Sequence, residues 1–196
     1  MLKRVALLCA AGVLLGGCAG SEPKPAYRGW TSVDELEPVN DVVLVGQPDP
    51  TGLLRYKQAG GEMVVDLRRD REHEMGVGFD EAKFMEAAGL RYERIPLSGK
   101  SFTADDVDRF GELLDEHRAM RTGQPLVVHC GSGGRAQLVY AAYVGQRDGL
   151  SPIDTVDYAI GLGSDWEPGL EHLWVLSGGD PEEVPEFEIP EDEEEN

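Results

Sequence analysis

Three glycines and a serine separate a cysteine from an arginine in the segment Cys130-Gly-Ser-Gly-Gly-Arg135. The apolar run Leu126-Val127-Val128 precedes this segment and predicts a short buried strand. A helical pattern follows from Ala136 to about Gln146. A strand, a tight glycine loop and a helix together direct several backbone N–H groups at one point, and such a point binds anions. The segment therefore predicts an anion-binding loop.

The two residues that bound this loop suggest chemistry as well as binding. Cys130 is the first residue of the loop, and a thiol at a helix N-terminus beside a guanidinium is expected to ionise to the thiolate at neutral pH. Arg135 offers a planar set of N–H donors that suits a tetrahedral oxyanion. We therefore expect a nucleophile and an anion clamp within six consecutive residues. The alternative is a buried, inert cysteine that packs as a small apolar residue.

Length and charge limit the classes of partner. The chain has 196 residues, which suits one domain with additional segments, and its 41% hydrophobic content is enough for a packed core. The formal net charge of −19 argues against binding to nucleic acid or to anionic membrane surfaces.

The N-terminus has the pattern of a targeting segment. Lys3-Arg4 is followed by an apolar run over residues 5–15, which is too short to span a bilayer as a mature helix. The run ends Leu15-Gly16-Gly17-Cys18 and resembles a bacterial lipobox. We predict a lipoprotein signal peptide over residues 1–17 and a lipid anchor on Cys18. The mature protein would then face the periplasm from one of the envelope membranes, inner or outer. The alternative is an ordinary secretory signal with an incidental cysteine.

The other segments divide the chain further. Residues 18–39 are expected to form a tether and lead-in, and residues 40–178 the folded domain. Residues 179–196 hold ten acidic residues, three prolines and no Lys or Arg, so they are expected to be a disordered, solvated tail. The alternative is that this tail recruits a partner. Cys9 would leave with the signal peptide and Cys18 would be acylated, so Cys130 would be the free thiol of the mature protein.

Strand and helix patterns alternate along the predicted domain. Strands are expected over residues 41–45, 63–67, 91–97 and 124–129, and helices over 52–58, 79–88, 104–117, 136–146, 153–160 and 170–176, with a charged loop over 68–74. This alternation predicts an α/β fold with a mostly parallel sheet of four to five strands and helices on both faces. Parallel strands place their following loops at one edge, so Gln47, Arg68, residues 98–100 and Cys130 are expected to share one rim.

Several phrases of the sequence, taken in order, resemble a known superfamily. They are Gly46-Gln47-Pro48, Val64-Val65-Asp66-Leu67-Arg68, Gly89-Leu90-Arg91-Tyr92 with Ile95-Pro96-Leu97, and Val128-His129-Cys130 before the glycine loop and Arg135. Together they resemble the protein tyrosine and dual-specificity phosphatase superfamily and, within it, the bacterial beta-lactamase-hydrolase-like phosphatases. The resemblance covers about residues 42–163.

The resemblance implies a role for each matching residue. Cys130 would be the nucleophile and form a thiophosphate intermediate, and Arg135 would hold the phosphoryl oxygens. The loop residues Gly131, Ser132, Gly133 and Gly134 would bind the substrate through backbone N–H groups. His129 would help to keep the thiolate form. Gln47 and Arg68 are further candidates for binding the substrate.

Three features depart from the usual phosphatase pattern. Four residues rather than five separate Cys130 from Arg135, which is also the loop length of the rhodaneses. Ala136 stands where Ser or Thr is common. The segment Ser98-Gly99-Lys100-Ser101 has no Asp to act as a general acid, so Asp105 and Asp106 are the candidates, although both suit the first turn of a helix equally well.

These observations leave three functions open. The first is a cysteine-dependent phosphatase, the second a sulfurtransferase that carries a persulfide on Cys130, and the third an inactive protein that binds an anion or a partner. The four histidines lack ligand spacing, so we expect no metal and no cofactor. The tryptophans are expected to serve packing.

Overall fold

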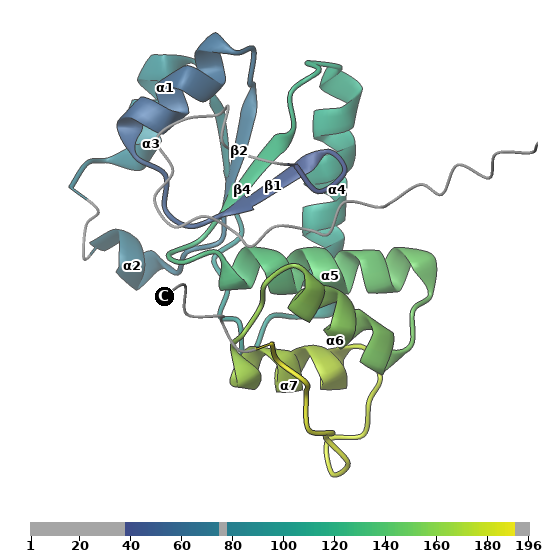
Figure 1. Cartoon of the computed structure of the whole chain (residues 1–196). Helices are drawn as coiled ribbons and strands as arrows, with labels where there is room; N and C mark the ends of the chain where they lie inside the picture. The colour runs from purple at the N-terminus through teal and green to yellow at the C-terminus, as the bar shows by residue number, and fades with distance from the viewer. Residues whose placement is uncertain (1–37, 75–77, 191–196) are drawn as a thin grey trace, which may run out of the picture.

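The computed structural model describes residues 38–74 and 78–190 of the chain (Figure 1). In this part the elements run in the order β1 (Val42–Val45), α1 (Pro50–Gln58), β2 (Met63–Asp66), α2 (Asp70–Glu74), α3 (Glu81–Ala88), β3 (Arg91–Arg94), α4 (Ala104–Met120), β4 (Leu126–His129), α5 (Gly134–Asp148), α6 (Pro152–Gly161) and α7 (Glu167–Leu176).

The four described strands form one parallel sheet in the order β1-β4-β2-β3. β4 pairs with β1 on one side and with β2 on the other, so the loop after β4 starts at the centre of the sheet edge. Val45 of β1 and Asp66 of β2 both lie level with His129 of β4. The predicted α/β class and mostly parallel sheet are confirmed.

Side-chain alternation along the strands divides the core between the two faces of the sheet. Figure 1 shows α1 and α3 on one face, and α4 with α5, α6 and α7 on the other. The smaller cluster joins the strands to α1 and α3 through Val43, Val45, Val64, Val127, Leu53, Tyr56, Met85 and Leu90. The larger cluster includes Val42, Leu44, Met63, Val65, Leu126, Val128 and the buried faces of α4 to α7.

Local signals explain where several elements begin and end. The side chain of Thr103 accepts a hydrogen bond from the N–H of Asp106, and the carboxylate of Asp106 accepts one from the N–H of Thr103, which is a capping box at the start of α4. Gly89 ends α3 in the left-handed region, at φ 67°. β3 ends at Arg94 rather than at Leu97, because Pro96 has no N–H for the ladder. Within the predicted charged loop, residues 70–74 form the short helix α2.

The predicted signal peptide, Cys18 and most of the predicted tether lie outside the described residues. Residues 179–190 of the predicted tail have no helix or strand, but Phe187 and Ile189 pack against the larger core cluster. This part of the segment is therefore attached to the domain, and a solvated tail stays a prediction for residues 191–196. Among the described helices, none is both long enough and apolar enough to cross a membrane.

Burial along α4 predicts how the helix contributes to stability. Leu114 is fully buried, whereas Met120 at the end of the same helix is 37% exposed. We expect Leu114→Ala to lower the free energy of unfolding by about 2–5 kcal/mol, because it leaves a cavity in the core. Met120→Ala should change it by less than about 0.5 kcal/mol. Chemical denaturation of both variants measures the difference, and equal effects would contradict this packing.

Candidate active site

The loop between β4 and α5 encloses the sulfur of Cys130. This side chain is 1% exposed, and the backbone N–H of Gly133 donates a hydrogen bond to Sγ at 3.1 Å. Gly133 has φ 103°, a conformation that a residue with a side chain rarely adopts. Among the described residues, no side chain caps the start of α5. No side-chain cap therefore engages its first N–H groups, and their binding of an anion stays a prediction.

Backbone contacts from β1 and β2 hold the start of this loop. The N–H of Gln47 donates to the carbonyl oxygen of Gly131 at 3.2 Å, and Gly46 forms an isolated bridge with Ser132. The N–H of Leu67 donates to the carbonyl oxygen of His129 at 2.9 Å. The loop is therefore fixed from both neighbouring strands before any ligand binds.

The guanidinium of Arg135 is held over the ends of two other strands. Nη1 donates to the carbonyl oxygens of Leu67 and Leu97 at 3.1 and 3.3 Å. The carboxylate of Glu72 accepts from Nη1 at 2.8 Å and from Nη2 at 2.6 Å. Arg135 thus connects α5 to α2 and to the segments after β2 and β3. Burial alone would lower the pKa of Arg135, because it disfavours the charged guanidinium. The hydrogen bonds and charge of Glu72 and the interaction with Cys130 outweigh burial and raise this pKa.

Glu72, Leu67 and Leu97 leave two N–H donors of Arg135, on the guanidinium that also interacts with the Cys130 side chain. A guanidinium has five N–H groups, and the contacts above engage both on Nη1 and one on Nη2. The remaining Nη2–H and the Nε–H lie on one edge of the guanidinium, in the geometry that binds two oxygens of a phosphate or sulfate. Glu72 therefore orients the clamp without occupying this edge.

The pKa of Glu72 reflects the same ion pair. Burial would raise the pKa of this carboxyl, but hydrogen bonds from Arg135 and Arg69 outweigh burial and lower it to about 2. Glu72 is thus ionised at any pH at which the domain would work, and it balances the charge of Arg135.

Gly99 and Trp166 lie beside the clamp. A Cβ atom added to Gly99 would lie 2.5 Å from the indole of Trp166 and 3.2 Å from Cγ of Arg135. A Cβ atom on Gly169 would likewise lie 2.6 Å from the same indole. Both glycines make room for Trp166, which packs as expected and yet remains 36% exposed next to Arg135.

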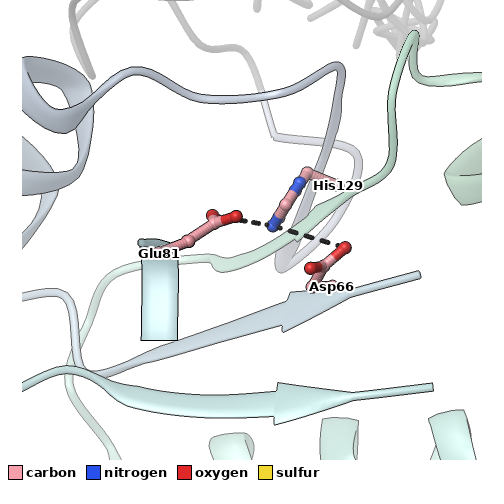
Figure 2. Close-up of side chains that lie close together, drawn as sticks. All are labelled: Asp66, Glu81 and His129. Atoms are coloured by element: carbon pink, nitrogen blue, oxygen red, sulfur yellow. Dashed lines mark ion pairs between the residues drawn. The ribbon is translucent and has the colours of Figure 1, made fainter. Parts of the chain in front are cut away.

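A buried polar cluster lies below the loop, on the face of the sheet that α3 covers. Asp66, Arg68, Glu81 and His129 are each at most 2% exposed. Arg68 donates to both carboxylates through Nη2, and to Asp66 also through Nε at 3.0 Å. His129 Nε2 lies 3.2 Å from Glu81 Oε1 and 3.9 Å from Asp66 Oδ1. Figure 2 marks both pairs with dashed lines.

The pKa of the Asp66 carboxyl is strongly shifted in this cluster. Burial would raise its pKa, but the charge of His129 and hydrogen bonds from Arg68 and Tyr92 hold the pKa of Asp66 well below its usual range. Burial and the charge of Asp66 raise the pKa of Tyr92, so its hydroxyl keeps the proton that it donates to Asp66 at 2.6 Å.

Asp66, Glu81 and His129 are also residues of the kind that bind metals, and one donor atom from each lies within 4.8 Å of the others. However, Arg68 already supplies a positive charge between the two carboxylates. The cluster therefore fits an internal ion network better than a divalent cation.

Two predicted substrate contacts are wrong for a common reason. Arg68 was expected at the anion loop, but its side chain is 2% exposed and engaged with Asp66 and Glu81. The side chain of Gln47 donates to Glu81 at 3.2 Å and to the carbonyl oxygen of Pro48, so only its backbone braces the loop. Both residues follow strands at the predicted edge, but both side chains contact Glu81 in the cluster, and Arg68 is also paired with Asp66.

The candidate general acids lie in the first turn of α4. The carboxylate of Asp106 accepts hydrogen bonds from the N–H and hydroxyl of Thr103, so it is engaged in the helix cap. Asp105 is exposed. Their role as general acids stays a prediction.

Two acidic residues of the site were not predicted from the sequence. They are Glu72, which pairs with Arg135, and Glu81, which lies 3.2 Å from His129. Glu72 lies in the charged segment directly after a predicted strand, at the predicted edge, so its position was a usable signal. Glu81 lies at the start of α3, where an acidic residue usually indicates only a helix N-terminus. No neighbouring residue in the sequence distinguishes Glu81 from an ordinary acidic residue at a helix start.

Part of the chain is similar in sequence to known proteins. No family model matches the chain. Two curated relatives, beta-lactamase hydrolase-like proteins of Xylella fastidiosa strains Temecula1 and 9a5c, are each 32% identical over 136 residues. The match covers 68% of this chain but spans only 30% of the length of these relatives. The predicted resemblance to this group is confirmed for that region.

Solved structures match over most of the described domain. A DUF442 protein of Shewanella putrefaciens CN-32 has a TM-score of 0.55 at 21% identity, over 72% of this chain and 87% of that one. The kinase associated phosphatase has a TM-score of 0.54 at 15% identity, over 67% and 82%. This chain has the phosphatase fold. Pseudomonas aeruginosa TpbA, in complex with phosphotyrosine, matches with a TM-score of 0.50 at 16% identity, over 72% and 81%.

The Glu72–Arg135 pair predicts a pH dependence of stability for this phosphatase fold. A carboxyl whose pKa is lowered by folding stabilises the native state above its unfolded value of 4.5, and this contribution is lost as the pH falls towards 2. Wild type should therefore exceed Glu72→Gln in denaturation midpoint at pH 6, and the difference should shrink between pH 4.5 and about 2.

Asp70→Asn is the matched control on α2, because Asp70 is 76% exposed in its pair with Arg94. This exposed pair should contribute little at any pH. A Glu72→Gln difference that stays constant from pH 6 to pH 2.5 would contradict the assignment.

Proposed function

We propose that this protein is a cysteine-dependent phosphatase that hydrolyses a phosphate monoester. One observation carries the proposal: within one strand-loop-helix unit, the Cys130 sulfur accepts a hydrogen bond from the loop N–H of Gly133 and also interacts with the guanidinium of Arg135. The fold supports a phosphatase-like hydrolase, since solved structures of that fold match most of the domain.

The reaction would proceed in two displacements. The thiolate of Cys130 attacks phosphorus, so an S–P bond forms while the P–O bond to the alcohol breaks. Water then attacks the same phosphorus, which releases inorganic phosphate and restores the thiolate. In both transition states the N–H groups of the loop and the edge donors of Arg135 stabilise the charge on the equatorial oxygens.

Preorganisation supports this mechanism over simple anion binding. Leu67, Leu97 and Glu72 already fix the guanidinium, and the Gly133 N–H already points at the sulfur. These groups need not reorganise when charge develops in the transition state. Substrates with good leaving groups should react best, because the described residues that contact Arg135 and Cys130 include no acid free to protonate the departing oxygen.

We expect Cys130→Ser to abolish turnover of p-nitrophenyl phosphate, since an alcohol is a far weaker nucleophile than a thiolate. Arg135→Lys should lower kcat/KM about 10² to 10³-fold, because an ammonium cannot donate from two positions on one edge. Arg109→Lys is the matched control, since Arg109 forms exposed ion pairs on α4, with Glu112 among others. Steady-state kinetics of the three variants measures these effects. Equal activity of wild type and Cys130→Ser would contradict the proposal.

Sulfur transfer is the second candidate, and the short Cys-x4-Arg loop favours it. On incubation with thiosulfate, the Cys130 thiolate would take its outer sulfur, the S–S bond of thiosulfate would break and sulfite would leave. The resulting persulfide would add about 32 Da to the peptide that holds Cys130. Mass spectrometry of wild type and Cys130→Ser distinguishes the two reactions. A stable adduct without phosphatase turnover would favour sulfur transfer, and tight phosphate binding without either reaction would favour an inactive binding protein.

We also propose that Cys18 carries a lipid that anchors the domain to a bacterial envelope membrane, facing the periplasm. Wild type produced in a bacterial host fed an alkyne fatty acid should become labelled, and Cys18→Ala should lose the label. Cys130→Ala should keep the label, which controls for acylation of the other thiol. Unchanged labelling of Cys18→Ala would contradict the anchor.

A further inference from the structure

His129 faces hydrogen-bond acceptors on both sides of its ring. Nδ1 lies 3.4 Å from the carbonyl oxygen of Cys130, and Nε2 lies 3.2 Å from Oε1 of Glu81. A carbonyl and an ionised carboxylate accept hydrogen bonds and cannot donate them. A neutral imidazole has one N–H group, so one ring nitrogen would direct a lone pair at an oxygen.

The facing atoms of His129 and Glu81 are otherwise unsatisfied. Nε2 and Oε1 are both buried, and neither has a hydrogen-bond partner of good geometry among the described residues. Buried polar atoms of this kind are costly unless they interact. A proton on Nε2 would form a charge-assisted hydrogen bond to Oε1 of Glu81. Both buried atoms would then have a hydrogen-bond partner.

The charges of the cluster favour the same proton. Asp66 and Glu81 are two carboxylates, and Arg68 is one guanidinium, all in a dry interior. An uncompensated buried charge is strongly unfavourable. A protonated His129 makes the sum zero. The other titratable groups facing the cluster are Tyr92 and His73, which lie 2.6 Å from Oδ2 of Asp66 and leave Oε1 of Glu81 to His129.

We infer that Glu81 is a positioning residue that holds His129 as an imidazolium directly below the active-site loop. The resemblance to the phosphatases already assigns His129 a part in keeping the thiolate form, and a fixed positive charge at this position would supply it together with that of Arg135. This second statement rests on the proposed function, whereas the protonation of His129 does not. Figure 2 shows the arrangement, with Glu81 reaching from α3 to the ring at the end of β4.

Nitrogen-15 NMR of the histidine rings tests the protonation directly. In wild type at pH 7.5 both ring nitrogens of His129 should have the shifts of protonated nitrogen. Glu81→Gln should convert one of them to the unprotonated form, because an amide no longer compensates the charge. Glu81→Asp should retain the imidazolium, and Glu86→Gln on the exposed face of the same helix should change nothing.

The pH profile of phosphatase activity gives the second readout. The acid limb of kcat/KM should move up by about one pH unit in Glu81→Gln and stay in place in Glu81→Asp, since loss of a nearby positive charge disfavours the thiolate. A residue that only supported the fold would lower the rate at every pH without moving this limb.

Defined results would overturn the inference. One is an unprotonated ring nitrogen on His129 in wild type at pH 7.5, a result that requires no variant to fold. Another is stoichiometric zinc or manganese bound to wild type and lost in Glu81→Gln, which would make the cluster a metal site. A doubly protonated His129 in a protein that hydrolyses no phosphoester would instead reject the proposed function and leave the Glu81–His129 pairing intact.

Discussion

The pairing of β4 between two parallel neighbours is the constraint on which the site depends. Side chains alternate along a strand, so consecutive residues at its end face opposite sides of the sheet. His129 turns towards α3, where it lies level with Asp66, and Cys130 turns towards the helices of the larger core. A one-residue shift in the register of β4 would exchange these positions and destroy both the loop and the cluster.

A second constraint is the balance of charge around two buried or half-buried arginines. Arg135 is paired with Glu72, and Arg68 with Asp66 and Glu81. The net charge of −19 would repel an anionic substrate at long range. Under the proposed function, affinity for a phosphate would have to come from short-range contacts with the loop N–H groups and the guanidinium of Arg135.

The sequence predicted those structural elements whose formation depends on residues close together in the chain. The strand, glycine loop and helix around Cys130 follow from consecutive residues, and the α/β alternation follows from hydrophobic periodicity. Arg68 shows the limit of this reasoning. Its place at the carboxyl edge was predicted correctly, but its side chain is held both by Asp66, two residues away, and by Glu81, which is thirteen residues away on another element. Long-range partners of this kind leave no local pattern in a sequence.

The central claim is that Cys130 is held as a reactive thiolate by the loop and Arg135. The most direct test is the rate at which iodoacetamide alkylates Cys130 at pH 6 and at pH 8.5, read by mass spectrometry of its peptide, with and without inorganic phosphate. A preformed thiolate predicts similar rates at the two pH values and protection by phosphate. An ordinary thiol would react about 150-fold more slowly at pH 6. That result, or the absence of protection by phosphate, would contradict the account.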